Sequence, residues 1–435
     1  MLRFLAVLFT GIIVSFYYFP FEFSFLPGLN TKMGLAVVGL AVAAYKLIQK
    51  RNPGVPKNVF EIFAVAVVVS LIGVFSVVIN NTPDYAYATY VISMCVWLSA
   101  AFATCSLIKY VHGDLTIEKV TMYVSAVCVF QCVMALIIDS NMAVKAFVDT
   151  YIMQDQKLLT ELERIYGIGA YLDVAGVRFS GCLILLMFAL NKNKNNMNNM
   201  QMLIALFAYV IIAVVGNMVA RTTIVGVGLS IIYALITFHP ERVSNSFFRL
   251  ARLILIVLAV ALPLSVYLYN NNLQFHELSR FAFEGFFNLF ENGEWEVSSN
   301  EKLKTMIVFP DNTKTWIMGD GYFTNPYYTD PTYVGYQPGG FYMGTDIGYL
   351  RFIFYFGLIG LLAFSYFFVV VAKNCSRKLP EYKMLILFIL ILGFVIWLKV
   401  ATDVFLIFAL LLCIADLQDD AGALVLELES EDTES

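Results

Sequence analysis

The sequence predicts an all-α protein that crosses a membrane about twelve times. Of its 435 residues, 60% are hydrophobic and 14% are charged, and the mean hydropathy is +0.76. Soluble domains are roughly 45–50% apolar and about 25% charged. Apolar runs of ~17–25 residues recur from one end of the chain to the other, each long enough to cross a ~30 Å hydrocarbon core. We therefore expect a single membrane-embedded domain over 1–435.

These apolar runs should be helices, because backbone N–H and C=O groups cannot stay unpaired in lipid. A β-barrel would instead show segments of about ten residues with alternating polarity. The first run, "MLRFLAVLFTGIIVSFYYF", lacks a small-residue cleavage site, so we interpret it as a retained span and not as a signal peptide. The expected spans are 2–20, 33–49, 59–79, 87–108, 119–139, 174–190, 200–218, 222–239, 252–270, 346–372, 384–399 and 401–416.

The connections between the expected spans alternate in charge. One set contains lysine or arginine, as in "KRNPGVPKN", "NKNKNNMNN" and "KNCSRKLPEYK", whereas "PFEFSFLPGLN" and "NNTPDYA" contain neither. Lysine and arginine concentrate in cytoplasmic loops, so the pattern predicts that both ends of the chain lie in the cytoplasm. The acidic segment 417–435 would then be a cytoplasmic tail, with a composition typical of disorder.

Two connections on the opposite, external side are long. The first, 140–173, has apolar residues at helical spacing, which predicts an amphipathic helix on the membrane surface or against the spans. The second, 271–345, begins with a helical pattern that places phenylalanines on one face and later contains the turn signal "GDGYF". A structureless connection of this length is uncommon unless it carries function. The phenylalanines are Phe283, Phe286, Phe287 and Phe290.

Four arginines on the external side are candidates for binding an anion. Positive charge is depleted on that side and is costly at membrane depth, so such residues are functional candidates. A guanidinium group offers a planar fork of donors that suits phosphate oxygens, and several on one surface would hold a pyrophosphate-sized anion. The alternative is that each arginine pairs with a carboxylate or extends to the headgroups. The four are Arg178 in "GVRFSG", Arg221 in "NMVARTT", Arg280 in "HELSR" and Arg351 in the span 346–372.

A fifth arginine, Arg164, follows Glu161 and Glu163 closely in the first external loop. We interpret it as a structural residue that pairs with these neighbours.

Candidate bases on the external side are His276, Glu277 and Glu284 in the second long loop, together with Asp346. Helical spacing puts His276 and Arg280 on one face, and Glu277 could simply pair with Arg280 three residues later. A base in this position would deprotonate or orient a hydroxyl group of a substrate.

Asp346 opens the span 346–372, where a carboxylate also stabilises a helix N-terminus. Arg351 follows five residues later, about 140° further around a helix axis. We therefore expect no simple pair between these two residues.

Other chemistries have no signature in the sequence. There is no P-loop, no dinucleotide-binding glycine motif, no H-E-x-x-H and no cluster of cysteine and histidine ligands. The external loops also lack the D-x-D that would hold a metal-bound phosphosugar. We expect no cofactor and no metal, and nothing in the composition indicates binding to nucleic acid.

In their order and sidedness, these motifs resemble the O-antigen polymerase (Wzy-type) family, which is related to the O-antigen ligases. The resemblance spans roughly 170–370 and rests on "RFSG", on "ARTT" in a tight hairpin, and on a large external loop with "GDGYF" that is followed by "GTDIGYLRFIFYFGLIGLL". The spans before residue 170 match only in hydropathy.

The resemblance implies a glycosyltransferase of the C type at the external face of a bacterial cytoplasmic membrane. The growing glycan would leave undecaprenyl pyrophosphate and join a sugar hydroxyl of another lipid-linked repeat unit. Family arginines bind the donor pyrophosphate, a role that carries over to Arg178, Arg221 and Arg280. The partners would be the lipid-linked donor and acceptor and the bilayer, and a chain-length regulator is a further candidate.

One departure from the related ligases bears on the choice of activity. Ligases carry a histidine in the element that reads "GTD" here, so its absence favours a polymerase and leaves Asp346, Glu277 and His276 as candidate bases. An O-antigen ligase, or a transporter or flippase for lipid-linked oligosaccharide, stays as the alternative. A flippase would be expected to have polar residues deep within its spans and repeated halves.

Overall fold

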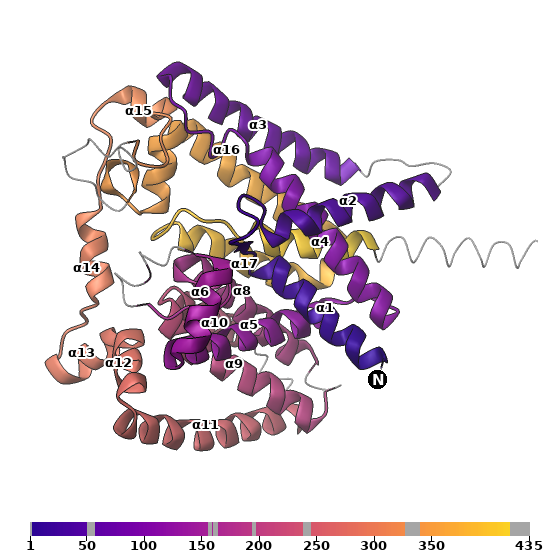
Figure 1. Ribbon diagram of the computed structural model, residues 1–435, viewed down its shortest axis with the longest axis vertical. Helices are drawn as coiled ribbons and strands as arrows, with labels where there is room; N and C mark the ends of the chain where they lie inside the picture. The colour runs from indigo at the N-terminus through magenta and orange to yellow at the C-terminus, as the bar shows by residue number, and fades with distance from the viewer. Residues whose placement is uncertain are drawn as a thin grey trace, which may run out of the picture. The chain divides into compact units, whose positions relative to one another are not determined.

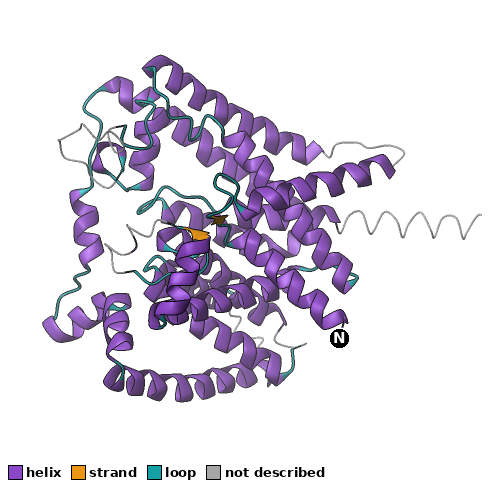
Figure 2. Ribbon diagram, viewed as in Figure 1, coloured by secondary structure: helices purple, strands orange, loops and turns teal. Residues whose placement is uncertain are grey.

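The computed structural model describes residues 2–49, 57–154, 159, 164–193, 197–237, 245–326 and 340–417. In this part of the chain almost all regular structure is helical, as Figure 2 shows. The exception is a short antiparallel ribbon of β1 (Glu22–Phe23) and β2 (Ile152–Met153). The predicted all-α class is thus confirmed apart from this ribbon.

Eight helices in the described residues are long and apolar enough to cross a membrane, and they indicate a multi-pass membrane protein (Figure 1). Each coincides with one of the spans expected from hydropathy. They are α2 (Thr31–Gln49), α3 (Lys57–Asn80), α4 (Tyr90–His112), α5 (Ile117–Ser140), α8 (Leu172–Asn193), α9 (Asn199–Val219), α11 (Asn245–Asn271) and α16 (Gly348–Lys378).

At the remaining expected spans the structure has shorter apolar helices. A helix of 14 residues, such as α10 or α17, is only about 21 Å long, which is less than the hydrocarbon thickness. The expectation of about twelve spans is therefore confirmed only at the eight longer helices. The shorter helices are α1 (Leu2–Tyr18), α10 (Thr223–Ile236), α17 (Lys383–Ile396) and Phe405–Leu417.

The chain divides into two compact units. The first comprises Met1–Gly39, Ala100–Trp295 and Cys413–Ser435, and the second comprises Leu40–Ser99 and Glu296–Leu412. The long loop 271–345 contributes to both units. Its helices are α12 (Leu273–Ala282), α13 (Glu284–Asn292), α14 (Ser298–Thr305), α15 (Thr313–Met318) and the 3-10 turn Tyr342–Gly344.

In the first unit, α8 packs closely against α10 and the turn that precedes it. A side chain at Gly176 would overlap the Thr222 hydroxyl, and one at Gly226 would overlap the backbone of Ser180. The Ser180 hydroxyl donates to the carbonyl of Thr222 at 2.9 Å and accepts the N–H of Gly226 at 3.1 Å. This packing fixes the start of α8 beside the tight turn that carries Arg221.

The predicted amphipathic helix in 140–173 is present as α6 (Met142–Tyr151). Val148 of α6 belongs to an apolar cluster of the first unit, together with Ile138 and Phe21. Of the two expected locations, this contact fits packing against the spans. Most of the stretch 155–163 lies outside the described residues.

The helical pattern predicted for the start of the second long loop is present as two helices, α12 and α13, with Phe286, Phe287 and Phe290 in α13 and a break at Phe283. The φ and ψ of Phe283 are −117° and 26°, α12 ends one residue earlier, and α13 begins one residue later. The carbonyls of Phe281 and Ala282 accept hydrogen bonds from the side chains of Arg221 and Asn217 at 2.9 and 3.1 Å. These side chains thus take over carbonyls that the next helical turn would otherwise use.

In the second unit, α3 lies along α16, and α15 packs where α16 itself breaks (Figure 1). The break falls at Phe356 and Gly357, whose φ of 68° and ψ of −173° are essentially accessible only to glycine. The released carbonyl of Tyr355 accepts from the N–H of Gly321 at 3.1 Å and from the Ser76 hydroxyl at 2.6 Å. Hydrogen-bond donors of the protein therefore pair with the carbonyl released at the break, as apolar surroundings require.

The turn predicted from "GDGYF" is confirmed, because Gly319 and Gly321 both have positive φ. The turn follows α15 directly, and its Asp320 N–H donates to the carbonyl of Phe354 at 2.6 Å. This short glycine-rich segment is therefore an integral part of the broken helix.

Replacement of Gly357 by alanine should lower the free energy of unfolding by about 3 kcal/mol or more, because the new methyl would be strained at this φ and would overlap the carbonyl of Ile317. Gly228→Ala in α10 is the control, since a methyl there meets no atom within 4 Å. The control should shift stability by less than ~1 kcal/mol. Unfolding titrations of both variants in mixed micelles measure the difference, and equal stabilities would contradict this account of the break.

Candidate functional site

Arg221 lies in the turn between α9 and α10 and is largely enclosed by α12 and α13. Its Nη1 pairs with Glu284 Oε2 at 2.7 Å, and its Nε donates to the carbonyl of Phe281 at 2.9 Å. The guanidinium carbon also lies 3.9 Å from the centroid of the Phe281 ring. Burial lowers the pKa of Arg221, and the charge of Glu284 opposes this shift.

Arg164 stacks on the same phenyl ring, with its guanidinium carbon 3.7 Å from the Phe281 centroid. Burial lowers the pKa of Arg164 to about 10, and the positive charge of Arg221 contributes to the lowering. The structure therefore brings two guanidinium groups together on one aromatic ring, close enough for their charges to repel. We call Arg164 and Arg221 the guanidinium pair, and Phe281 is the ring on which both stack.

The sequence interpretation of Arg164 as the partner of Glu161 and Glu163 falls on glutamates outside the described residues. Its proximity to Arg221 was missed, because nothing in the spacing of the two residues links them. The only signal available was that Arg164 is itself an arginine on the expected external side.

Arg178 lies near the start of α8 and is 8% exposed. Its guanidinium carbon is 5.6 Å from the Phe19 ring, and its backbone carbonyl accepts the hydroxyl of Tyr18 at 2.8 Å. Two residues earlier, Gly176 packs on Thr222, so Arg178 and Arg221 lie on directly contacting elements.

Arg280 forms a separate cluster at the junction of α11, α12 and α13. It makes a two-bond ion pair with Glu291, at 2.8 and 2.6 Å, and a 3.2 Å hydrogen bond to the hydroxyl of Tyr269. The hydrogen bonding of the Arg280 guanidinium to the Glu291 carboxylate is the main cause of the raised pKa of Arg280. The expected pairing of Arg280 with Glu277 is therefore wrong, because folding at Phe283 brings Glu291 back to it.

His276 also contacts Tyr269, which confirms that His276 and Arg280 share one helix face. The two rings stack at 4.1 Å, and His276 Nδ1 lies 3.3 Å from the carbonyl oxygen of Tyr269. Glu277, one residue further along α12, is exposed.

In the second unit, Asp346 and Arg351 form an ion pair, with Asp346 Oδ1 3.6 Å from Arg351 Nη1. The expectation that they would not pair is wrong because Asp346 lies outside the helix. α16 begins at Gly348, and the intervening Ile347 is extended with φ and ψ of −63° and 117°. The helical rotation per residue therefore does not apply to Asp346.

Arg351 is 8% exposed and is held by two segments of the long loop. Its Nη2 donates to the carbonyl of Phe323 at 3.1 Å, and its guanidinium carbon lies 3.7 and 4.7 Å from the rings of Phe323 and Phe341. Asp84, which has no distinctive motif around it in the sequence, accepts the N–H groups of Phe323 and Thr324 at 2.9 and 3.0 Å. Arg351 and Asp84 thus fasten the same short segment.

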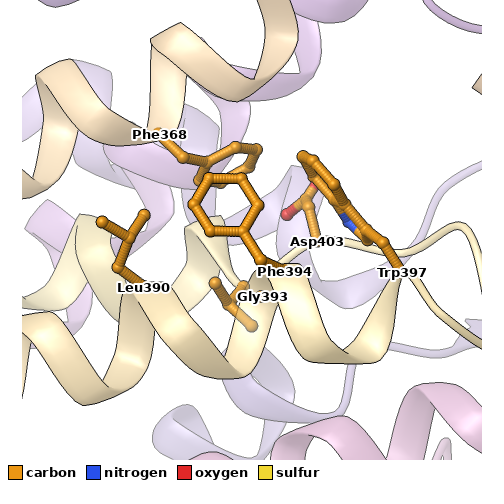
Figure 3. Close-up of a pocket in the computed structure, with 7 residues that line it drawn as sticks. Phe368, Leu390, Gly393, Phe394, Trp397 and Asp403 are labelled. Carbon is orange, nitrogen blue, oxygen red and sulfur yellow. The ribbon is translucent and has the colours of Figure 1, made fainter. Parts of the chain in front are cut away.

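A crevice in the second unit contains a carboxylate among aromatic rings (Figure 3). Asp403 faces Trp397, Phe394 and Phe368 there, but the crevice has no room for a water molecule. Asp403 Oδ1 accepts the N–H of Phe405 at 2.9 Å, at the start of the helix Phe405–Leu417. This carboxylate therefore serves the local fold.

A larger cavity of about 340 Å³ lies between α3, α15 and the break of α16, and apolar side chains line it. Its lining suits hydrocarbon, not a polar sugar. Among the residues that the structure describes, no group of three or more histidine, cysteine, aspartate or glutamate side chains could hold a metal ion.

Comparisons with known proteins yield no relative. No protein-family model matches the chain, and searches of curated proteins and of solved structures return no match. The resemblance described from the sequence therefore rests on its short motifs alone.

Replacement of Arg351 by methionine should lower the free energy of unfolding by about 2–4 kcal/mol, because it leaves the partly buried Asp346 without its counter-charge. Arg377→Met is the matched control on the same helix, since the pair of Arg377 with Glu61 is about half exposed. That substitution should cost less than ~1 kcal/mol. The two variants are compared by denaturant unfolding, and equal losses would contradict the role assigned to Arg351.

Proposed function

We propose that this protein is a polysaccharide polymerase of the bacterial cytoplasmic membrane. It transfers a growing O-antigen or capsule glycan from undecaprenyl pyrophosphate to a sugar hydroxyl of another lipid-linked repeat unit, at the external face. The observation that carries the proposal is the guanidinium pair, in which Arg164 and Arg221 stack on Phe281. The order of the short motifs supports it independently.

The chemistry of the guanidinium pair suits a leaving pyrophosphate. When the glycosidic bond to the donor breaks, negative charge develops on the phosphate oxygens, and positioned donors stabilise that charge most effectively in a poorly hydrated site. Arg221 is 12% exposed, and the pKa of Arg164 is lowered chiefly by burial, so both groups lie in such a setting. Arg178, on the contacting helix α8, would add a third positive charge. The mechanism assigns to arginines the role that a metal ion has in other transferases.

The acceptor hydroxyl needs a group that orients it or takes its proton. In the first unit, His276 is held by Tyr269 and Glu277 is exposed, which leaves the Glu277 carboxylate accessible to a substrate. In the second unit, Asp346 is paired with Arg351, and this pairing suits orientation of a hydroxyl better than removal of its proton. We propose these three residues as the candidates for that role.

The alternative activities have weaker support. Transporters bind substrates at broken helices that line a cavity. α16 is broken, but its released carbonyls already accept hydrogen bonds from the Gly319–Gly321 turn and from Ser76. The break therefore does not favour transport. An O-antigen ligase would use the same donor and differs in its acceptor, so genetics separates it from a polymerase.

Arg221→Ala and Arg178→Ala should each abolish long-chain surface glycan and leave single repeat units, because the leaving pyrophosphate loses its counter-charge. Arg377→Ala is the control, since its half-exposed ion pair lies in the last turn of α16. Gel profiles of surface glycan are compared after immunoblots show equal amounts of each variant in the membrane. Normal chain length in Arg221→Ala would contradict the anion site.

Deletion of the gene distinguishes a polymerase from a ligase. A strain without a polymerase should still cap its surface lipid with one repeat unit, because transfer to the final acceptor is intact. A strain without a ligase should lose all capped lipid. Electrophoresis of extracted lipopolysaccharide shows which outcome holds. If all of the lipid is uncapped, the protein is a ligase and the proposed polymerase activity is wrong.

A further inference from the structure

The junction of α12 and α13 covers the guanidinium pair with a carboxylate of its own chain. Two side chains of the α9–α10 hairpin, Asn217 and Arg221, donate to the carbonyls at the end of α12. Such carbonyls at a helix C-terminus carry partial negative charge and attract cations. Glu284 follows as the first residue of α13 and pairs with Arg221 at 2.7 Å.

This arrangement gives Arg221 an anion of the same kind that a phosphate would supply. A carboxylate and a phosphate oxygen both bind the planar guanidinium fork through charge-assisted hydrogen bonds. The charges of Asp173 and Glu284 both act on Arg164, but burial and the positive charge of Arg221 outweigh them, and Glu284 itself carries only a single charge. A pyrophosphate carries more negative charge and would neutralise both groups.

The position of the Glu284 carboxylate also allows it to move away from Arg221. The Glu284 side chain is 25% exposed, twice the 12% of its partner Arg221, so it can move into solvent without passing through the core. The exchange would replace one charge-assisted hydrogen bond of Arg221 with another. The protein would therefore lose little when an anion takes the place of Glu284.

We propose that Glu284 is an internal substitute for the donor pyrophosphate, which occupies Arg221 in the described structure and is displaced when an anion binds. The Glu284 carboxylate then acts as a plug over Arg221. This inference rests on the proposed function, because it takes the guanidinium pair to be the pyrophosphate site. It adds that Glu284 competes with pyrophosphate for Arg221 and thereby sets the affinity of the site for pyrophosphate.

The test measures binding of inorganic pyrophosphate to the full-length protein in lipid nanodiscs by isothermal titration calorimetry. Glu284→Gln keeps the shape of the side chain and removes its charge, so it should lower the Kd roughly ten- to a hundredfold. Glu301→Gln removes the same charge from the exposed pair with Lys304 on α14. That control should leave the Kd within about twofold, which excludes a general effect of net charge.

Two further variants keep the result interpretable. Glu284→Asp retains the charge at the start of α13 but withdraws the carboxylate by one methylene group, so it should lower the Kd in the same direction by a smaller factor. It serves in place of Glu284→Gln if that variant does not fold. Arg221→Ala should abolish the binding that the unmodified protein shows.

The outcomes distinguish a failure of the proposed role of Glu284 from a failure of the proposed pyrophosphate site. If Arg221→Ala abolishes binding but both Glu284 variants bind pyrophosphate as weakly as the unmodified protein, or more weakly, the plug is overturned and the anion site stands. If pyrophosphate binds equally well without Arg221, the anion site is overturned and the plug with it. Tighter binding by the Glu284 variants alone, with Glu301→Gln unchanged, supports the plug.

Discussion

A backbone carbonyl that is released where a helix breaks must find a donor inside the protein, and this requirement organises both units. In apolar surroundings an unpaired carbonyl costs several kcal/mol, which is comparable with the whole stability of many domains. In α16 the carbonyls released before Gly357 accept from the Gly319–Gly321 turn and from Ser76. Between α12 and α13 they accept from Asn217 and Arg221. Loop segments and arginines are thereby fixed at the same places where the helices are interrupted.

Two arginines, one in each unit, are held by the same set of contacts. Each donates to the carbonyl of a phenylalanine, stacks on the ring of that phenylalanine and pairs with a carboxylate. These sets are Arg221 with Phe281 and Glu284, and Arg351 with Phe323 and Asp346. Such a set by itself only fastens a loop. Arg164 distinguishes the first set, because it places a second guanidinium on the Phe281 ring, which a loop anchor does not need.

Hydropathy predicted the helical class and the eight long apolar helices, since a span is a local property of about twenty residues. The details that failed depend on residues distant in the sequence. The periodicity of the phenylalanines gave no sign of the break at Phe283, beside which Arg221, some sixty residues away in the sequence, binds the carbonyl of Phe281. The pairing of Asp346 with Arg351 was missed because the helix was assumed to start two residues too early. The sequence marks Arg178, Arg221, Arg280 and Arg351 as unusual charges, but only tertiary structure brings Arg164 to Arg221.

The donors at both helix breaks precede the carbonyls they serve in the order of synthesis. Ser76 and the Gly319–Gly321 turn are made before Tyr355, and Asn217 and Arg221 are made before Phe281. Chains fold from the N-terminus as they emerge during synthesis. The break in α16 can therefore be closed as soon as that helix inserts, and the α12–α13 junction as soon as it is made, because the hydrogen-bond donors already exist. The direction of translation thus spares α16 a period in which its released carbonyls would face lipid.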